Sequence, residues 1–464
     1  MVLMESFSGI RGIYGKDLTE ETAIRYVHSF SEFIKKKAKK NNATVVIGMD
    51  TRPSGLILKN SIKEIVDCNF IDVGIATTPA IEFAVRHFNA DGGVIITASH
   101  NEPYWNGFKF LGSDGAVLSE KEMNEVIKNS KFLKNFHKVQ ERKITEKNEE
   151  AIEEYKNFIL KIIGKKNIES IKKSKQRLLI DPNGGSGVIA KAILESVGVE
   201  VIALNMEIGQ FNRTIEPTED ALVYLKSAIE KNNADFAAAF DCDADRVEIM
   251  LRSGKLLSGN YILALVVQEA LSNADKNKKH TIVINDATSN AVRDIAQKFN
   301  AKIKEVEVGE SNVVHEMDNS KALVGGEGSS GGSITPPSKC RDGILALLQV
   351  LSIVAKQNKK LDGIIDALPK YYNLKKKVEF DLKNHDKIKK SLKIYYSKKS
   401  LETKEITGIK GSLKVITGKN SFIWFRASKT ESGVFRIIAD SDDKKESENL
   451  MEEAVKVFDD ANKQ

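Results

Sequence analysis

The sequence predicts an α/β protein with three similar α/β domains, whose sheets are mixed but mostly parallel, and a C-terminal α+β domain. The first observation is a repeat: a short apolar strand that ends in an acidic residue occurs at residues 44–50, 176–181 and 280–286. The second is the last quarter of the chain, where short runs of alternating polar and apolar residues replace this pattern. The third is length, because 464 residues exceed what one ordinary hydrophobic core accommodates.

Each of the three repeats continues in the same way. A turn and a helical stretch follow the first strand, and a second apolar stretch follows the helix. These second stretches are Phe70–Ile75, Glu200–Asn205 and Lys302–Val308. Strands that alternate with helices are typical of βαβ units with parallel strands. The copies lie roughly 105–135 residues apart, too far for a solenoid repeat, so they indicate three separate domains.

The C-terminal quarter is expected to form an antiparallel α+β domain. Its strand-like runs are Lys376–Leu382, Leu413–Ile416, Ser421–Phe425 and Val434–Ala439. Helical stretches lie near residues 386–395 and 446–458. Polar segments separate the parts of the chain and predict four domains, at residues 1–147, 148–253, 254–370 and 371–464.

Composition excludes several classes of protein. The formal charge of +7 suits an anionic ligand, but it is spread in runs typical of solvated faces, so we expect no nucleic-acid partner. No charged-then-apolar signal sequence opens the chain, and the longest apolar runs, Tyr261–Val267 and Ile344–Ala355, are too short to span a bilayer, so we expect no membrane association. Three widely spaced cysteines do not form a disulfide framework. We expect a cytoplasmic protein; its oligomeric state is left open, and a homodimer is compatible with the sequence.

A serine loop, residues 97–109, follows the buried-looking strand Gly93–Ile96. Ser99 therefore lies at the carboxyl end of a strand, where α/β sheets place their ligands. A serine hydroxyl can carry a phosphoryl group, and His100 and Lys109 are a nearby proton donor and a positive charge. On its own the pattern is more typical of a turn that is hydrogen-bonded through Ser and Asn side chains.

An aspartate loop, residues 241–246, connects two apolar strands. Asp241, Asp243 and Asp245 gather negative charge that a cation would compensate, and hard carboxylate oxygens favour Mg²⁺ or Ca²⁺. An EF-hand does not fit, because Arg246 and Arg252 replace its required Gly and Glu. A Mg²⁺ site with a phosphate oxygen in the shell fits better, and an acidic solvent-exposed turn is the alternative.

A glycine loop, residues 325–332, would let a ligand approach the backbone closely. Glu327 and Ser329 supply an acceptor and a donor for sugar hydroxyls. The loop lacks the Lys-Ser/Thr ending of a P-loop, which argues against nucleotide binding. A flexible linker is the alternative interpretation.

The fourth loop, residues 426–436, lies between two strands of the last domain. Ser428, Lys429, Thr430 and the loop amides would form an anion-binding concavity, and Arg426 would give bidentate contact to a phosphate. An ordinary polar hairpin is the alternative.

Together the four loops resemble the α-D-phosphohexomutases, the family of phosphoglucomutases, phosphomannomutases and phosphoglucosamine mutases. The resemblance covers essentially the whole chain, keeps the order of the motifs, and begins with Ser8–Gly12, which is similar to the family's N-terminal Gly-x-Arg-Gly segment. It implies four domains around a central cleft and assigns a role to each motif. Ser99 would be the phosphoserine, and Asp241, Asp243, Asp245 and the phosphate on Ser99 would hold one Mg²⁺. The remaining residues would line the transfer site (Arg11, His100, Lys109, Arg246), grip the sugar (Glu327, Ser329) or bind the non-transferring phosphate (Arg426, Ser428, Lys429, Thr430).

The implied reaction is reversible transfer of a phosphoryl group between the 1- and 6-positions of a hexose phosphate, through a hexose 1,6-bisphosphate. The sequence departs from the family at several loop positions; for example, Glu310 stands where some members have a histidine. These departures leave open which hexose phosphate is preferred (glucose, mannose or glucosamine), and the sequence does not identify the general acid or base. Two other classes stay open: a metal-dependent sugar phosphatase that uses the same serine, and a non-catalytic sugar-phosphate sensor.

Overall fold

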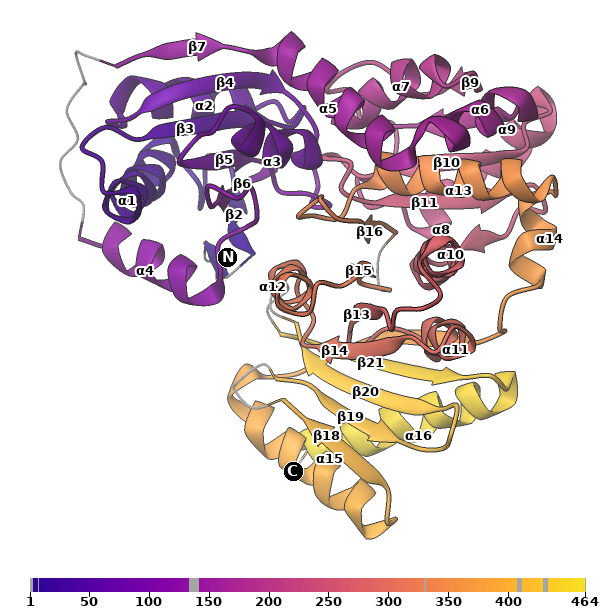
Figure 1. Ribbon diagram of the computed structural model, residues 1–464. Coiled ribbons are helices and arrows are strands. Elements are labelled where there is room, and N and C mark those ends of the chain that lie inside the picture. The colour runs from indigo at the N-terminus through magenta and orange to yellow at the C-terminus, as the bar shows by residue number, and fades with distance from the viewer. Residues whose placement is uncertain are drawn as a thin grey trace.

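Four sheets follow one another along the chain in the computed structural model, which describes residues 3–6, 8–132, 142–328, 331–406, 411–428 and 433–463. In Figure 1 the sheets with their helices are arranged along an arc, with the N-terminal and C-terminal sheets at its two ends. Three of the sheets mix parallel and antiparallel strands, and the fourth is entirely antiparallel. The predicted fold class is therefore confirmed.

The first sheet has seven strands in the order β1-β2-β6-β5-β3-β4-β7. Its strands are β1 (Met4–Ser6), β2 (Gly9–Ile13), β3 (Thr44–Met49), β4 (Asn69–Ile75), β5 (Gly92–Ile96), β6 (Trp105–Leu111) and β7 (Ile144–Glu146), and its helices are α1 (Glu20–Ala38), α2 (Gly55–Ile65), α3 (Thr78–His87) and α4 (Glu120–Ser130). Alternate residues of β3 face opposite layers: Val45 and Ile47 pack with α1, α2 and α4, and Val46 packs with α3.

The second sheet has the order β12-β11-β10-β8-β9. Its strands are β8 (Arg177–Asp181), β9 (Glu200–Ala203), β10 (Phe236–Phe240), β11 (Val247–Leu251) and β12 (Leu256–Leu257), and its helices are α5 (Asn148–Ile163), α6 (Lys165–Ser174), the 3₁₀ turn Ser186–Ile189, α7 (Ala190–Ser196), α8 (Glu219–Leu222) and α9 (Tyr224–Asn232). β10 runs parallel to β8 and antiparallel to β11, so the aspartate loop is the connection between β10 and β11 at the edge where β8 also ends.

The third sheet has the order β14-β13-β15-β16. Its strands are β13 (Thr281–Asn285), β14 (Lys302–Val306), β15 (Val324–Gly326) and β16 (Ser333–Ile334), and its helices are α10 (Gly259–Asn273), α11 (Asn290–Lys298), α12 (Glu310–Ser320), α13 (Gly343–Gln357) and α14 (Leu361–Asp366). The two long apolar runs of the sequence fall in α10 and α13, which are buried on most sides because they pack against each other and against neighbouring helices.

The fourth sheet has the order β17-β21-β20-β19-β18, with every pair antiparallel. Its strands are β17 (Tyr372–Glu379), β18 (Glu402–Glu405), β19 (Leu413–Ile416), β20 (Phe422–Ala427) and β21 (Val434–Ser441), and its helices are the 3₁₀ turn Leu382–Asn384, α15 (His385–Lys398) and α16 (Lys444–Lys463). β18 carries no strand signal in the sequence, because its four residues are polar and lie at the edge of the sheet.

The hydrophobic cores divide differently from the sheets. One apolar cluster runs from α3 through α5 and the second sheet to α10 and α13, and so joins the first three sheets. The fourth sheet has its own core under α15 and α16. A small cluster of Ala287, Phe422, Trp424 and Ile438 connects it to the third sheet. Within the described ranges, no helix combines the length and apolarity needed to cross a bilayer.

Candidate active site

Ser99 lies directly beyond the carboxyl end of β5 and is almost fully buried. Its backbone has φ +52°, a left-handed conformation that costs energy for a residue with a side chain. Ser99 N donates to Thr97 Oγ1 over 2.8 Å, and Ser99 Oγ donates to Asp241 Oδ2 over 3.3 Å. The serine and aspartate loops, 142 residues apart in sequence, therefore meet at this hydroxyl.

A buried ion pair beneath the serine loop fixes its conformation. Arg52 Nε donates to Asp50 Oδ2 over 3.0 Å, and both side chains are inaccessible to solvent. The same guanidinium donates to the main-chain oxygens of Ser99 (2.7 Å), Asn101 (2.6 Å) and Glu102 (2.8 Å). Arg52 is not among the predicted site residues. The sequence feature that could have identified Arg52 is its position two residues after Asp50, the acid that ends the first strand.

The three aspartates converge at the connection between β10 and β11. One carboxylate oxygen from each of Asp241, Asp243 and Asp245 lies within 4.8 Å of the others, and all three side chains are buried. Asp243 Oδ1 and Asp245 Oδ1 have no hydrogen-bond partner among the described residues. Buried carboxylate oxygens of this kind are the ligands that Mg²⁺ and Ca²⁺ prefer, so this donor set fits a divalent cation.

Besides Ser99, two more side chains from the first domain contact the aspartates. Lys109 Nζ donates to Asp243 Oδ2 over 2.8 Å and to Asp245 Oδ2 over 3.2 Å, while Thr78 Oγ1 donates to Asp243 Oδ2 over 2.7 Å. Burial and the other two carboxylates raise the pKa of Asp241 well above its usual range. Burial would also raise the pKa of Asp245, but Lys109 and nearby arginines hold it below its usual value.

Arginines and a neutral histidine surround Ser99. Arg11 Nη1 donates to Asn101 Oδ1 over 2.9 Å, and Arg246 Nε lies 3.7 Å from Asp241 Oδ2 and 3.6 Å from Asp245 Oδ1. Burial, together with Arg246 and Arg11, lowers the pKa of His100 well below its usual value. His100 is therefore an uncharged imidazole at neutral pH, and its Nδ1 has no hydrogen-bond partner in the part of the chain that the structure describes.

Glu327 is held between the third sheet and an arginine. Its Oε1 accepts from Asn285 Nδ2 over 3.0 Å and from Gly309 N over 2.9 Å, at the start of α12. Its Oε2 lies 3.4 Å from Arg341 Nη1. Ser329, the predicted partner of Glu327, lies outside the described residues.

The fourth loop, residues 426–436, begins at the end of β20. Arg426 Nη2 donates to Glu307 Oε1 over 3.0 Å, and the Arg426 side chain is buried. Arg426 is paired across the strands with Arg436 on β21, and Ser428 N donates to Val434 O over 2.8 Å. The predicted residues Lys429 and Thr430 lie outside the described part of the chain.

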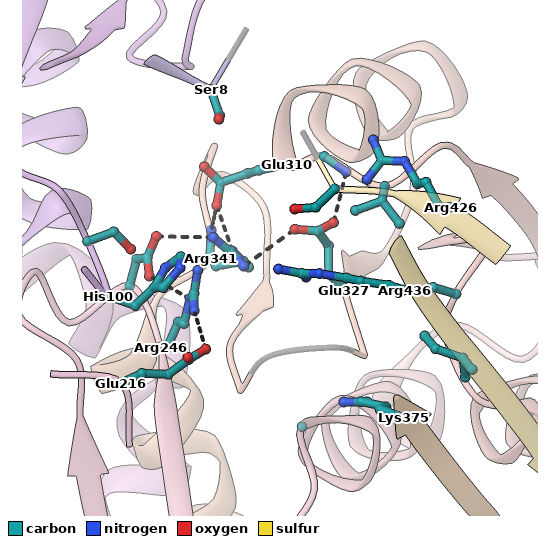
Figure 2. Close-up of a pocket in the computed structure, with 18 of the residues that line it drawn as sticks. Ser8, His100, Glu216, Arg246, Glu310, Glu327, Arg341, Lys375, Arg426 and Arg436 are labelled. Carbon is teal, nitrogen blue, oxygen red and sulfur yellow. Dashed lines mark hydrogen bonds and ion pairs between the residues drawn. The ribbon is translucent and has the colours of Figure 1, made fainter. Parts of the chain in front are cut away.

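All four domains line one cavity of about 670 Å³, a volume typical of small-molecule sites. Figure 2 shows His100 and Arg246 on one side of it, Arg426, Arg436 and Lys375 on the other, and Arg341 with Glu327 between them. Besides the predicted residues Ser99, Arg11, His100, Lys109, Asp245, Arg246, Glu327, Arg426 and Ser428, it is lined by residues that sequence reasoning missed, which include Glu216, Glu248, Arg341, Lys375 and Arg436. Positive charge at both ends and hydrogen-bonding groups in the middle suit a polar molecule that carries two anionic groups.

Models of the phosphoglucomutase/phosphomannomutase family match three segments of the chain: α/β/α domain I at residues 5–135, domain II at 153–254 and domain III at 258–372. A phosphoglucomutase/phosphomannomutase of Thermococcus kodakarensis is 33% identical over 462 residues, 98% of each chain. A phosphoglucosamine/phosphogalactosamine mutase of Sulfurisphaera tokodaii is 30% identical over 97% of each chain.

Solved structures share the fold over nearly the whole length. The pp63/parafusin phosphoglucomutase of Paramecium superimposes with a TM-score of 0.84 at 20% identity and covers 99% of this chain and 96% of its own. A phosphoglucomutase/phosphomannomutase family protein of Burkholderia thailandensis gives a TM-score of 0.80 at 20% identity, with 99% and 98% coverage.

Proposed function

This chain belongs to the phosphoglucomutase/phosphomannomutase family and is a phosphohexomutase, and we propose that it moves a phosphoryl group reversibly between the 1- and 6-positions of a hexose phosphate. The carrier is phosphorylated Ser99, and the intermediate is a hexose 1,6-bisphosphate. One observation carries the proposal: Ser99 Oγ lies 3.3 Å from Asp241, in a cavity whose other end is lined by Arg426 and Arg436.

At the serine end, positioning and charge neutralisation perform most of the chemistry, because phosphoryl transfer passes through a loose transition state. A Mg²⁺ ion bound by Asp241, Asp243, Asp245 and the phosphate on Ser99 would supply Lewis-acid neutralisation there. Arg246 and Lys109 add positive charge. The neutral His100 can accept a proton from the attacking sugar hydroxyl and return it in the reverse direction.

At the sugar end, Glu327 and Ser329 bind the ring hydroxyls, while Arg426, Ser428, Lys429 and Thr430 bind the phosphate that is not transferred. Because Ser99 is the carrier in both half-reactions, the bisphosphate must turn end for end before its other phosphate returns to Ser99. This requirement explains why two sets of cationic residues face each other across the cavity.

For the substrate we propose glucose and mannose phosphates, because the relative with 33% identity is a phosphoglucomutase/phosphomannomutase. Glucosamine phosphate is the second candidate, since the relative from Sulfurisphaera tokodaii acts, by its name, on phosphorylated amino sugars. Steady-state rates with the 1-phosphates of glucose, mannose and glucosamine rank the three.

The reaction class is tested by recording ³¹P NMR spectra of the protein with each hexose 1-phosphate and a catalytic amount of the matching 1,6-bisphosphate. A mutase produces the 6-phosphate without net release of inorganic phosphate, whereas a phosphatase releases it and a sensor converts nothing. Purified protein should contain a species about 80 Da heavier that localises to Ser99. Ser99→Ala should lack this species and lose several orders of magnitude in rate. Net phosphate release as the main reaction would overturn the proposal.

A further inference from the structure

Arg341 contacts both the aspartate loop and Glu327. Its Nη2 donates to Asp245 Oδ2 over 3.1 Å, and its Nη1 lies 3.4 Å from Glu327 Oε2. Glu310 Oε2 accepts from both Arg341 Nε (3.0 Å) and Arg341 N (2.9 Å). Figure 2 shows Arg341 near the middle of the cavity, with Glu310 above it and Glu327 to its right.

The segment that bears Arg341 is packed against the aspartate loop, so the guanidinium has little freedom to move away. Gly343 N donates to Ala244 O over 3.2 Å, and a Cβ at Gly343 would lie 2.7 Å from Arg246 O. A Cβ at Gly332 would lie 2.7 Å from Asp245 O and 3.3 Å from Arg341 Cβ. Because these contacts involve the backbone, they hold the Arg341 guanidinium beside the carboxylates more firmly than side-chain contacts would.

We propose that Arg341 is a positioning residue with two effects: it orients Glu327 toward the sugar, and it lowers the affinity of the three aspartates for a divalent cation. The first effect follows because Glu327 Oε1 is held by Asn285 and Gly309, and Arg341 is the cation at Oε2. The second follows because the guanidinium occupies a lone pair of Asp245 and repels a second positive charge a few ångströms away.

The two effects predict changes of opposite sign in one variant. Arg341→Met removes the positive charge and the N–H donors of the guanidinium. The dissociation constant for Mn²⁺, used as an EPR-visible probe, should therefore fall by about tenfold. The dissociation constant for the hexose 6-phosphate that the wild type binds best should rise by about tenfold or more. A residue that only stabilises the fold would weaken both ligands together.

The experiment measures free Mn²⁺ by EPR and hexose 6-phosphate binding by calorimetry on metal-stripped full-length protein. Arg252→Met is the matched control, because Arg252 follows the far end of β11 and donates to Ala234 O and Asn233 Oδ1; it should leave both constants within about twofold. If Arg341→Met does not fold, Arg341→Lys decides: it retains the charge, so Mn²⁺ affinity should stay within about twofold while sugar-phosphate affinity falls.

The sugar arm rests on the proposed function, whereas the Mn²⁺ arm does not. If the wild type binds none of the glucose, mannose and glucosamine 6-phosphates, the proposed function fails, and the Mn²⁺ constants still test Arg341. An unchanged or weaker Mn²⁺ affinity in Arg341→Met, or equal losses for both ligands in Arg341→Lys, would overturn the inference.

Discussion

Arg52 Nη2 donates to the main-chain oxygen of Ser99 over 2.7 Å, so a side chain 47 residues earlier fixes the backbone of the candidate phosphate carrier. Thr97 adds a second constraint: its Oγ1 donates to Asp50 Oδ2 over 2.6 Å and accepts from Ser99 N. The left-handed conformation of Ser99 persists because these bonds on both sides of the residue outweigh its cost. The serine hydroxyl is thus held toward the aspartates before any ligand binds.

Arg52→Met should reduce both stability and turnover. It leaves the Asp50 carboxylate buried without its cation and three loop carbonyls without their donor, which costs about 3–5 kcal/mol. We expect a lower thermal midpoint. We also expect kcat to fall by about a hundredfold or more, because the Ser99 hydroxyl is no longer held toward the aspartates.

Lys59→Met is the matched control for Arg52→Met. It breaks another buried ion pair in the same domain, Lys59 with Asp72 at 2.9 Å, away from the serine loop. It should lower the thermal midpoint and leave kcat within a fewfold. Equal losses of kcat in the two variants would contradict a specific effect of Arg52 on the loop.

Sequence reasoning was strongest where a local pattern determines structure. The two apolar strands predicted on either side of the aspartate loop are found at Phe236–Phe240 and Val247–Leu251, because continuous apolar runs between polar turns have few other conformations. The β1–β2 hairpin and β18 carry too little apolar signal to be identified from sequence. These strands form because they pair with a neighbouring strand: Gly9–Ile13 pairs with β6, and Glu402–Glu405 pairs with β19.

For the candidate site, the motifs identify the loops, and the fold identifies the side chains that support them. Ser99 and Asp241 stand in recognisable motifs at strand ends, and parallel strands bring such ends to one edge. Arg341 contacts Asp245 and Glu310 from 96 and 31 positions away, which no local pattern reveals. Glu248 and Lys375 lie within strands, where alternation alone does not distinguish a cavity-facing charge from a solvated one.

The three aspartates should bind a divalent cation that activity requires. A chelator should abolish turnover and Mg²⁺ should restore it. Mg²⁺ should also raise the thermal midpoint, because it binds the folded loop and not the unfolded chain. Asp243→Asn should weaken this stabilisation by Mg²⁺, with the shift in midpoint measured against Mg²⁺ concentration. Full turnover in excess chelator would rule out the cation requirement.

Arg426→Ala should weaken substrate binding by about 1.5–3 kcal/mol through loss of a charge-assisted hydrogen bond to the distal phosphate. Thermal stability should fall as well, because Arg426 is buried and its ion pair with Glu307 at 3.0 Å is broken. The double variant Arg426→Ala/Glu307→Gln also neutralises the carboxylate of this ion pair. It should regain thermal stability but not KM, and a KM at the wild-type level in either variant would show that Arg426 does not bind the phosphate.

The last prediction concerns Glu248, which lies on β11, lines the cavity and accepts from Gly331 N over 3.4 Å. Burial raises the pKa of this carboxyl to about 7, although the Gly331 amide, Lys375 and Arg246 favour the ionised form. In the unfolded chain it titrates with a pKa near its usual value of 4.5. Between these two values the folded state binds the proton and the unfolded state does not, so stability is lost as pH rises through this window. Glu248→Gln, which is neutral at every pH, should therefore leave the thermal midpoint nearly unchanged at pH 4, below both pKa values, and raise it at pH 8, where ionised Glu248 costs the wild type up to about 3 kcal/mol. Thermal unfolding of both proteins across this range measures the difference, and an offset between them that does not vary with pH would refute the prediction.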